Sequence, residues 1–138
     1  MADAVGLVLA DDPSDEEVLS LVAEAGGKVL PAETIDGLIE EGTGTVWVAV
    51  RPEYQIPLDD EDFILYHQKL GAPAAKQVLL TISRGTGSEE LAFDFIQRAA
   101  SRWCLLVDNG WGTVYTPEEL TEKARRSRQQ GVSIFFPT

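Results

Sequence analysis

The segment WCLLVDNGWGTVYTPEEL, residues 103–120, contains the signals that decide the fold of this chain. Its first apolar run, 103–107, predicts a β-strand. Asn109 and Gly110 follow and predict a tight turn, because both residue types tolerate positive φ. The second apolar run, 111–115, then predicts the returning strand of a hairpin.

The residues after this hairpin predict the start of a helix. Thr116 suits the N-cap, Pro117 suits the first helical position, and Glu119 completes a capping box. Asp108 stands just before the turn, where an aspartate usually accepts a hydrogen bond from the nearby backbone. We therefore interpret the segment as strand, turn, strand and helix, and Asp108 as a turn residue rather than a catalytic acid.

Working outward, caps and apolar spacing predict further helices. Ser14 and Glu17 form a capping box, and Ser88 is expected to cap the helix that follows it. The segment 34–41 has apolar residues at helical spacing, and 58–70 has one semi-apolar face that includes Phe63, Ile64, Tyr66, His67 and Leu70. The expected helices are 14–25, 34–41, one within 58–70, and 88–101.

The strands and helices together predict the architecture. Strands are expected at 5–10, 45–51, 76–83 and 103–107, with a short one at 28–31. Their order indicates an α+β domain over residues 1–138 with a ferredoxin-like β-α-β-β-α-β core, insertions, and a C-terminal hairpin and helix. A doubly wound, three-layer α/β fold is the alternative, because strands and helices alternate over much of the chain.

Charge is distributed unevenly along the chain. The 138 residues carry a net charge of −12, with 16 acidic and two basic residues before position 67 and seven acidic and nine basic residues from there on. Such a field repels nucleic acid and anionic lipid and attracts cationic proteins. Acidity that serves only solubility is the simpler interpretation. The basic stretch 123–128 suits the end of a helix and is expected to pair with the acidic half of the same protein.

A basic protein partner is thus the first functional hypothesis. The acids expected to bind it could mimic phosphate charge and steer association. They are Asp11, Asp12, Asp15, Glu16, Asp59, Asp60, Glu61 and Asp62.

The sequence contains few residues that could bind a metal ion or a cofactor. The only His and Cys are His67 and Cys104, too few for a zinc or iron–sulfur site. The acidic run 59–62 lacks the alternating ligands and central glycine of a calcium loop. We expect no metal and no cofactor, and we expect Cys104 to be a small buried residue within its strand.

Two alternatives to the binding protein remain open. A small-molecule enzyme or ligand sensor would use a pocket near Arg84, Asp108 and Tyr115. The turn at 83–88 follows a strand and opens a helix, which is a suitable place to bind an anion. The sequence of this turn matches no phosphate-binding fingerprint. A self-associating structural module would use Phe135 and Phe136, within the apolar segment 132–137, to form a homodimer. The first residues show no signal peptide or membrane span, which favours the cytoplasm.

Three segments carry a resemblance to a known protein type. They are VLLTISR at 78–84, ELAFDF at 90–95, and VDNGWGTVYTPEEL at 107–120. With its acidity and single α+β domain, the chain resembles the immunity proteins of bacterial polymorphic-toxin systems. That resemblance implies stoichiometric binding of a toxin domain and no catalysis, and it transfers no contact residue.

Overall fold

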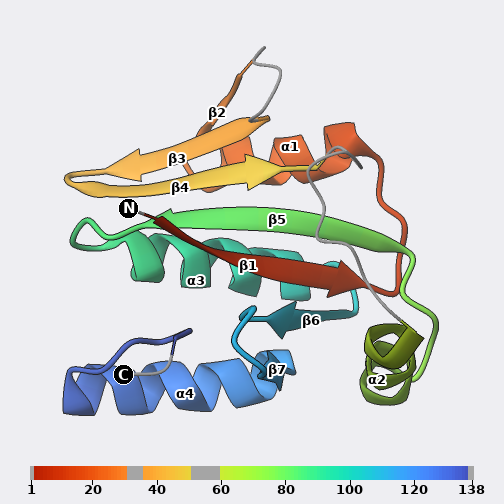
Figure 1. Cartoon of the computed structure of the whole chain (residues 1–138). Coiled ribbons are helices and arrows are strands. Elements are labelled where there is room, and N and C mark those ends of the chain that lie inside the picture. Colours follow the sequence, from red (N-terminus) through yellow and green to blue (C-terminus); the bar gives the residue numbers. More distant parts are fainter. Residues whose placement is uncertain (1, 31–35, 51–59, 137–138) are drawn as a thin grey trace.

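The structure, a computed structural model, describes residues 2–30, 36–50 and 60–136 (Figure 1). These residues form four helices and a single open seven-stranded sheet. In chain order the elements are β1 (Ala2–Leu9), α1 (Asp15–Glu24), β2 (Lys28–Val29), β3 (Gly37–Glu41), β4 (Gly44–Ala49), α2 (Asp60–Leu70), β5 (Lys76–Ser83), α3 (Ser88–Ala100), β6 (Leu105–Asp108), β7 (Val114–Tyr115) and α4 (Pro117–Gln130).

The sheet has the strand order β2-β3-β4-β5-β1-β6-β7, and each neighbouring pair is antiparallel. The four main strands expected from the sequence are β1, β4, β5 and β6. They lie side by side in the order β4-β5-β1-β6. The prediction of an α+β protein is therefore confirmed, and the doubly wound alternative is wrong because it requires a parallel sheet.

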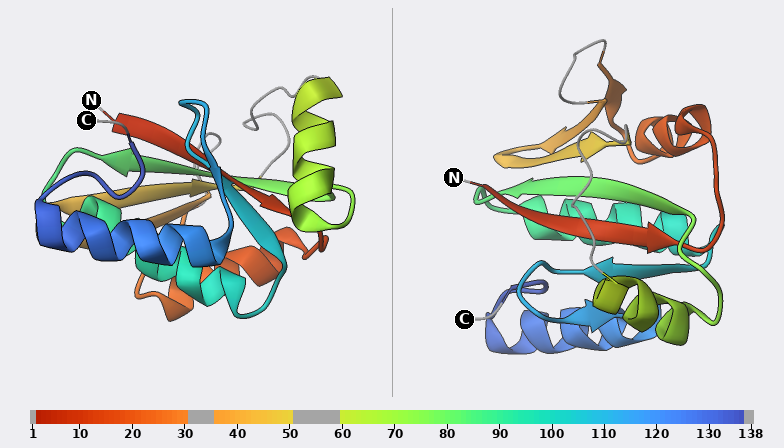
Figure 2. Two further views of the ribbon diagram at one scale, coloured as in Figure 1. Left: turned by 90° about the horizontal axis from the view of Figure 1, so that it is seen from below. Right: turned by 45° about the vertical axis from the view of Figure 1, so that its right-hand side comes forward.

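The helices lie unequally on the two faces of the sheet. Helices α1, α3 and α4 cover one face, where alternate residues of the strands form the main core with them (Figures 1 and 2). Helix α2 stands on the opposite side, at one end of the sheet (Figure 2, left). There Tyr66 packs on Val8 and Leu106 in a small second core. None of the helices described here is long and apolar enough to cross a bilayer.

The segment 34–41 corrects one prediction, because residues 37–41 form strand β3 instead of a helix. Residues 34 and 35 lie outside the described part of the chain. The apolar spacing fitted a helix, but backbone pairing with β4 decides the outcome, with Leu38 opposite Trp47. At Gly37, a Cβ would lie 3.1 Å from a methyl group of Val22, so glycine lets this strand lie close to α1.

Two helix starts follow the predicted cap chemistry, α4 in full and α1 in part, because the Glu17 carboxylate contacts the Ser14 hydroxyl and not the Ser14 backbone N–H. The Ser14 hydroxyl accepts a hydrogen bond from the Glu17 N–H, at 3.1 Å. At α4, Thr116 accepts from the Glu119 N–H at 3.2 Å, and the Glu119 carboxylate accepts from the Thr116 N–H at 2.9 Å. This is the reciprocal capping box expected from the sequence.

Ser88 differs from its expected role, because the N-cap of α3 is Gly87 and Ser88 is the first helical residue. Its side chain is buried at the junction of two turns. The hydroxyl accepts from the Thr45 N–H at 2.9 Å and lies 2.6 Å from the Ser83 hydroxyl. The serine therefore joins the start of β4 to the end of β5 instead of capping its own helix.

Cys104 is exposed, which corrects the expectation of a small buried residue within a strand. Strand β6 begins only at Leu105. The Cys104 N–H donates to the Asp11 carboxylate at 2.8 Å, and the Ala10 N–H donates to the Cys104 carbonyl at 2.9 Å. The residue thus ends a loop that is tied to the end of β1.

The C-terminal segment docks on the core without forming a strand. Ile134 and Phe135 are 2% and 0% exposed, and Phe136 packs against the same core. The Glu89 carboxylate accepts from the Ile134 N–H at 2.9 Å, and Asn109 donates its side-chain N–H to the Phe135 carbonyl at 2.8 Å. Residue 137 is outside the described range. Burial of Phe135 removes it from any homodimer contact of the kind considered for 132–137.

Candidate protein-binding surface

The acids expected to bind a partner lie in two places. Asp11 and Asp12 follow β1, and Asp15 and Glu16 are in the first turn of α1. Residues 60–62 form the first turn of α2, while Asp59 is not among the described residues. Helices α1 and α2 lie on opposite sides of the sheet (Figure 2), so the acids in the first turns of these two helices do not share one face.

Some of these acids already serve the fold. The Asp11 carboxylate accepts from the Cys104 backbone, as described above. Asp15 forms an ion pair with Lys76, with 2.7 Å between the carboxylate oxygen and Nζ. Of the acids expected to bind a partner, Asp12, Glu16, Asp60 and Glu61 are exposed and make no such contact with the described residues. These four are therefore the members of that set that remain available to a partner.

Most cations of the described residues are neutralised within the protein. Seven ion pairs are present among these residues, and all seven of their cations lie at residue 69 or later. The pairs are Lys69–Glu119, Lys76–Asp15, Arg84–Asp3, Arg98–Asp94, Arg102–Glu24, Arg125–Glu122 and Arg128–Glu90.

The basic stretch on α4 shows this pairing most clearly. A hydrogen bond from Arg125 lowers the pKa of Glu122, and Glu122 in turn raises the pKa of Arg125. Arg128 pairs with Glu90, which raises the pKa of Arg128, and its guanidinium lies 5.3 Å from the centre of the Phe93 ring. These arginines are held against their own protein, but by Glu122 and Glu90 of the C-terminal half and not by the acidic N-terminal half that was expected to pair with them.

Helix α2 is anchored along one side. Tyr66 is 2% exposed, and its hydroxyl donates to the Asp108 carboxylate. One turn later, Lys69 Nζ donates to the Val114 carbonyl at 2.6 Å and pairs with Glu119 at 3.3 Å. The helix is therefore held to β6, β7 and α4 by polar contacts at the edge of the small core.

The other sides of α2 present apolar side chains to solvent. Phe63 is 49% exposed, Ile64 is 58% exposed and Leu65 is 40% exposed. The acidic first turn, with Asp60 and Glu61, directly precedes them. Large exposed apolar side chains that gather on one element, next to charged residues, are typical of an interaction site.

Sequence reasoning missed the exposed apolar side chains of α2, although a signal was present. Three consecutive apolar residues, 63–65, cannot all face one core, because successive residues of a helix are about 100° apart. Only the position of Tyr66 against Val8 and Leu106 decides which side is buried. The expected semi-apolar face is thus anchored at Tyr66 and half-buried Leu70, while Phe63 and Ile64 remain exposed.

A second exposed aromatic residue lies in the β6–β7 connection. Trp111 is 64% exposed. The loop beneath it is fixed by Asn109, whose side-chain oxygen accepts from the N–H groups of Trp111 and Thr113, at 2.8 and 3.1 Å. Asp108 accepts from the Gly110 N–H at 2.8 Å, which is the turn role expected of it.

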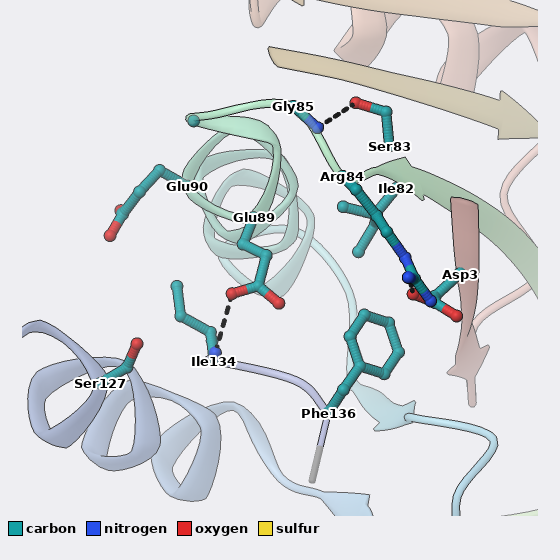
Figure 3. A pocket seen from close by; sticks show the side chains of 11 residues that line it. Asp3, Ile82, Ser83, Arg84, Gly85, Glu89, Glu90, Ser127, Ile134 and Phe136 are labelled. Atoms are coloured by element: carbon teal, nitrogen blue, oxygen red, sulfur yellow. Dashed lines mark hydrogen bonds and ion pairs between the residues drawn. The ribbon is translucent and has the colours of Figure 1, made fainter. Parts of the chain in front are cut away.

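The three residues of the proposed ligand pocket lie at separate places. Arg84 lines a cavity of about 390 Å³ near the start of β1 and the C-terminal segment (Figure 3). Tyr115 lies in a different depression, beside Glu118 and Arg126. Asp108 is engaged by Tyr66 and the turn. The three side chains therefore line no common cavity.

The charged side chains of the cavity at Arg84 are already engaged by other groups of the protein. Arg84 Nε lies 3.5 Å from the Asp3 carboxylate, and Glu89 holds the Ile134 N–H (Figure 3). Glu90 is paired with Arg128. These contacts join the ends of β1 and β5 to the C-terminal segment, so they give the cavity a structural role. Over the residues that could be searched, no group of three or more His, Cys, Asp or Glu side chains is arranged to hold a metal ion.

Comparisons with protein-family models, curated proteins and solved structures gave no match. The function must therefore be argued from the geometry and charge of this chain.

Proposed function

We propose that the chain is a non-catalytic binding protein that engages a basic protein partner through exposed carboxylates. The observation that carries this proposal is the unequal pairing of charges. Within the described residues, seven cations are neutralised by local ion pairs, whereas Asp12, Glu16, Asp60 and Glu61 remain exposed and unpaired. The field that a partner meets is therefore strongly negative.

A toxin domain of the kind neutralised by immunity proteins is one partner with the required charge. The arrangement β4-β5-β1-β6, crossed by α1 and α3, supports a ferredoxin-like core as the scaffold. The cytoplasm is the compartment we propose, because a single exposed thiol at Cys104 stays reduced there.

The test is an affinity capture from the native host's lysate at low and at high salt, with the bound proteins identified by mass spectrometry. We expect one cationic protein in stoichiometric amount, released as salt rises, because screening weakens charge attraction beyond about 10 Å at 0.1 M salt. Recovery of the chain without a cationic partner would contradict the proposal.

A pair of variants separates local recognition from net charge. Asp60→Asn with Glu61→Gln removes two charges from α2, and Glu40→Gln with Glu41→Gln removes two exposed charges from β3. Both variants have the same net charge. We expect the α2 variant to weaken capture and the β3 variant to retain it. Equal weakening would show that only the overall charge matters.

A further inference from the structure

The two elements that carry most of the exposed apolar side chains, α2 and the β6–β7 connection, lie on one side of the sheet. Helix α2 and the β6–β7 connection both rise from the face of the sheet that α1, α3 and α4 leave open (Figure 2, left). Four of the five large apolar residues that are exposed within the described range belong to these two elements, at positions 63, 64, 65 and 111. The fifth, Val29, is on β2 at the opposite edge of the sheet.

Two consecutive residues hold these elements in a fixed relation. Asp108 accepts the hydroxyl of Tyr66 from α2 and the N–H of Gly110 from the turn. Asn109, which is 2% exposed, holds the Trp111 N–H and donates to the Phe135 carbonyl. Helix α2 and the tryptophan loop are thus tied to the same end of β6. A surface fixed in this way loses little conformational freedom on binding.

We propose that α2 and Trp111 together form the docking surface for a cationic protein that presents an apolar patch bordered by Lys or Arg. This inference rests on the proposed function and specifies its contact site. Ile64 and Trp111 are the apolar anchors, with Phe63 and Leu65 beside Ile64. Asp60 and Glu61 supply the charge that meets the basic border.

Charge decides between the possible occupants of this surface. A second copy of the chain would bring another Asp60 and Glu61 and another net charge of −12 to the contact. An anionic membrane would repel the same carboxylates. A cationic protein satisfies both the apolar side chains and the acids.

The size of ordinary interfaces explains why both elements are needed. A specific interface takes about 20 to 30 residues from each partner. One helix of 11 residues, anchored along Tyr66, cannot supply that surface. Trp111 extends it across the open side, and tryptophan is enriched among residues that dominate binding energy.

Site-specific photo-crosslinking tests this placement. A photoreactive phenylalanine analogue replaces Ile64, Trp111 or, as the matched control, Val29, which is 53% exposed. Each full-length chain is irradiated in the host lysate, and adducts are identified by mass spectrometry. We expect adducts from positions 64 and 111 on the same cationic protein, and none on that protein from position 29.

The recovered partner is then purified and titrated against simple variants. Ile64→Ser and Trp111→Ala should each weaken binding by about tenfold or more, as expected for apolar anchors, and Val29→Ser should leave it unchanged. All three side chains are more than half exposed, so these changes leave the core intact.

Several results would contradict the proposal that α2 and Trp111 form the docking surface. They are adducts between two copies of the chain, adducts to lipid, adducts of equal yield from position 29, and no adduct at positions 64 and 111. If a cationic protein is still captured in a salt-sensitive way, and is lost in the variant of Asp60 and Glu61, then only this placement fails and the proposed function stands. If no cationic protein is captured, both fail.

Discussion

Asp108 uses its two carboxylate oxygens for two different contacts. One accepts the Gly110 N–H of the turn, and the other accepts the Tyr66 hydroxyl of α2. The residue was the strongest candidate for a catalytic acid in the segment 103–120. Its full engagement in local structure instead makes it the link between the hairpin and the helix.

Loss of that link should be measurable in Tyr66→Phe. The ring stays on Val8 and Leu106, but a hydrogen bond to a charged group is removed, so the free energy of unfolding should fall by about 1.5 kcal/mol. Tyr115→Phe is the matched control, because its hydroxyl makes no hydrogen bond to the described residues. Urea unfolding followed by circular dichroism measures both, and equal effects would contradict the assignment.

At the scale of elements, two turns pack backbone against backbone. The β3–β4 turn contains Thr43 and Gly44, and the β5–α3 turn contains Gly85 and Gly87. A Cβ on Gly85 would lie 1.9 Å from the Thr43 carbonyl oxygen, and one on Gly44 would lie 2.9 Å from the backbone of Gly87. Glycine is required here by contact rather than by φ at these two positions.

We therefore expect Gly85→Ala to lower the free energy of unfolding by about 3 kcal/mol, because neither backbone can move aside cheaply. Gly42→Asn is the control in the neighbouring turn. Gly42 has φ +61° and nothing within 4 Å of an added Cβ, and asparagine tolerates that conformation. It should change the unfolding free energy by less than about 1 kcal/mol. A stable Gly85→Ala protein would mean that the two turns are not in contact.

The cap of α4 makes a prediction about pH. The Thr116 N–H and then Lys69 lower the pKa of Glu119 below its usual value of 4.5. A lowered carboxyl pKa contributes stability that is present above 4.5 and is lost as pH falls through the folded-state pKa. Glu119→Gln keeps an acceptor for Thr116 but does not titrate.

Stability of the Glu119→Gln variant should therefore fall less steeply than that of the unaltered chain between about pH 5 and about pH 3. The carboxylate is well exposed, so solvent screening keeps the difference small. Urea midpoints at each pH provide the comparison. Parallel curves would show that the capping contact does not alter the pKa.

These elements also show what the sequence could predict. Helices α1, α3 and α4 begin within one residue of their expected positions, because caps such as Ser14 and Thr116 act through neighbours in sequence. Strand β3 was expected as a helix, because its apolar residues have helical spacing and only backbone pairing with the next strand, with Leu38 opposite Trp47, makes it extended.

Some residues of the candidate docking surface could likewise be predicted from sequence, and others could not. The exposure of Asp60 and Glu61 follows from a charged first turn, which sequence shows directly. The exposure of Ile64 depends on where Tyr66 meets Val8, on a strand far away in the chain. The acidic residues of the proposed docking surface could therefore be predicted from sequence, whereas its exposed apolar residues were identified only by the packing of α2.

At the scale of the whole molecule, two electrostatic effects oppose each other. The seven ion pairs among the described residues attract, at separations of up to 3.5 Å, while a net charge of −12 repels across the molecule. The ion-paired side chains are mostly exposed, and such pairs contribute about 0 to 1 kcal/mol each. The unpaired acids on α1 and α2 repel over longer distances.

Salt weakens the long-range repulsion between unpaired acids more than it weakens the ion pairs. The Debye length falls from about 30 Å at 0.01 M to about 10 Å at 0.1 M, so long-range repulsion is screened before contact pairs are. The urea midpoint of the unaltered chain should therefore rise with sodium chloride over this range. A variant with Asp12→Asn, Glu16→Gln, Asp60→Asn and Glu61→Gln should show a smaller rise, because it has four fewer unpaired charges. A midpoint that falls with salt would mean that the ion pairs dominate and that the surplus acids are too dispersed to present a strong field to a partner.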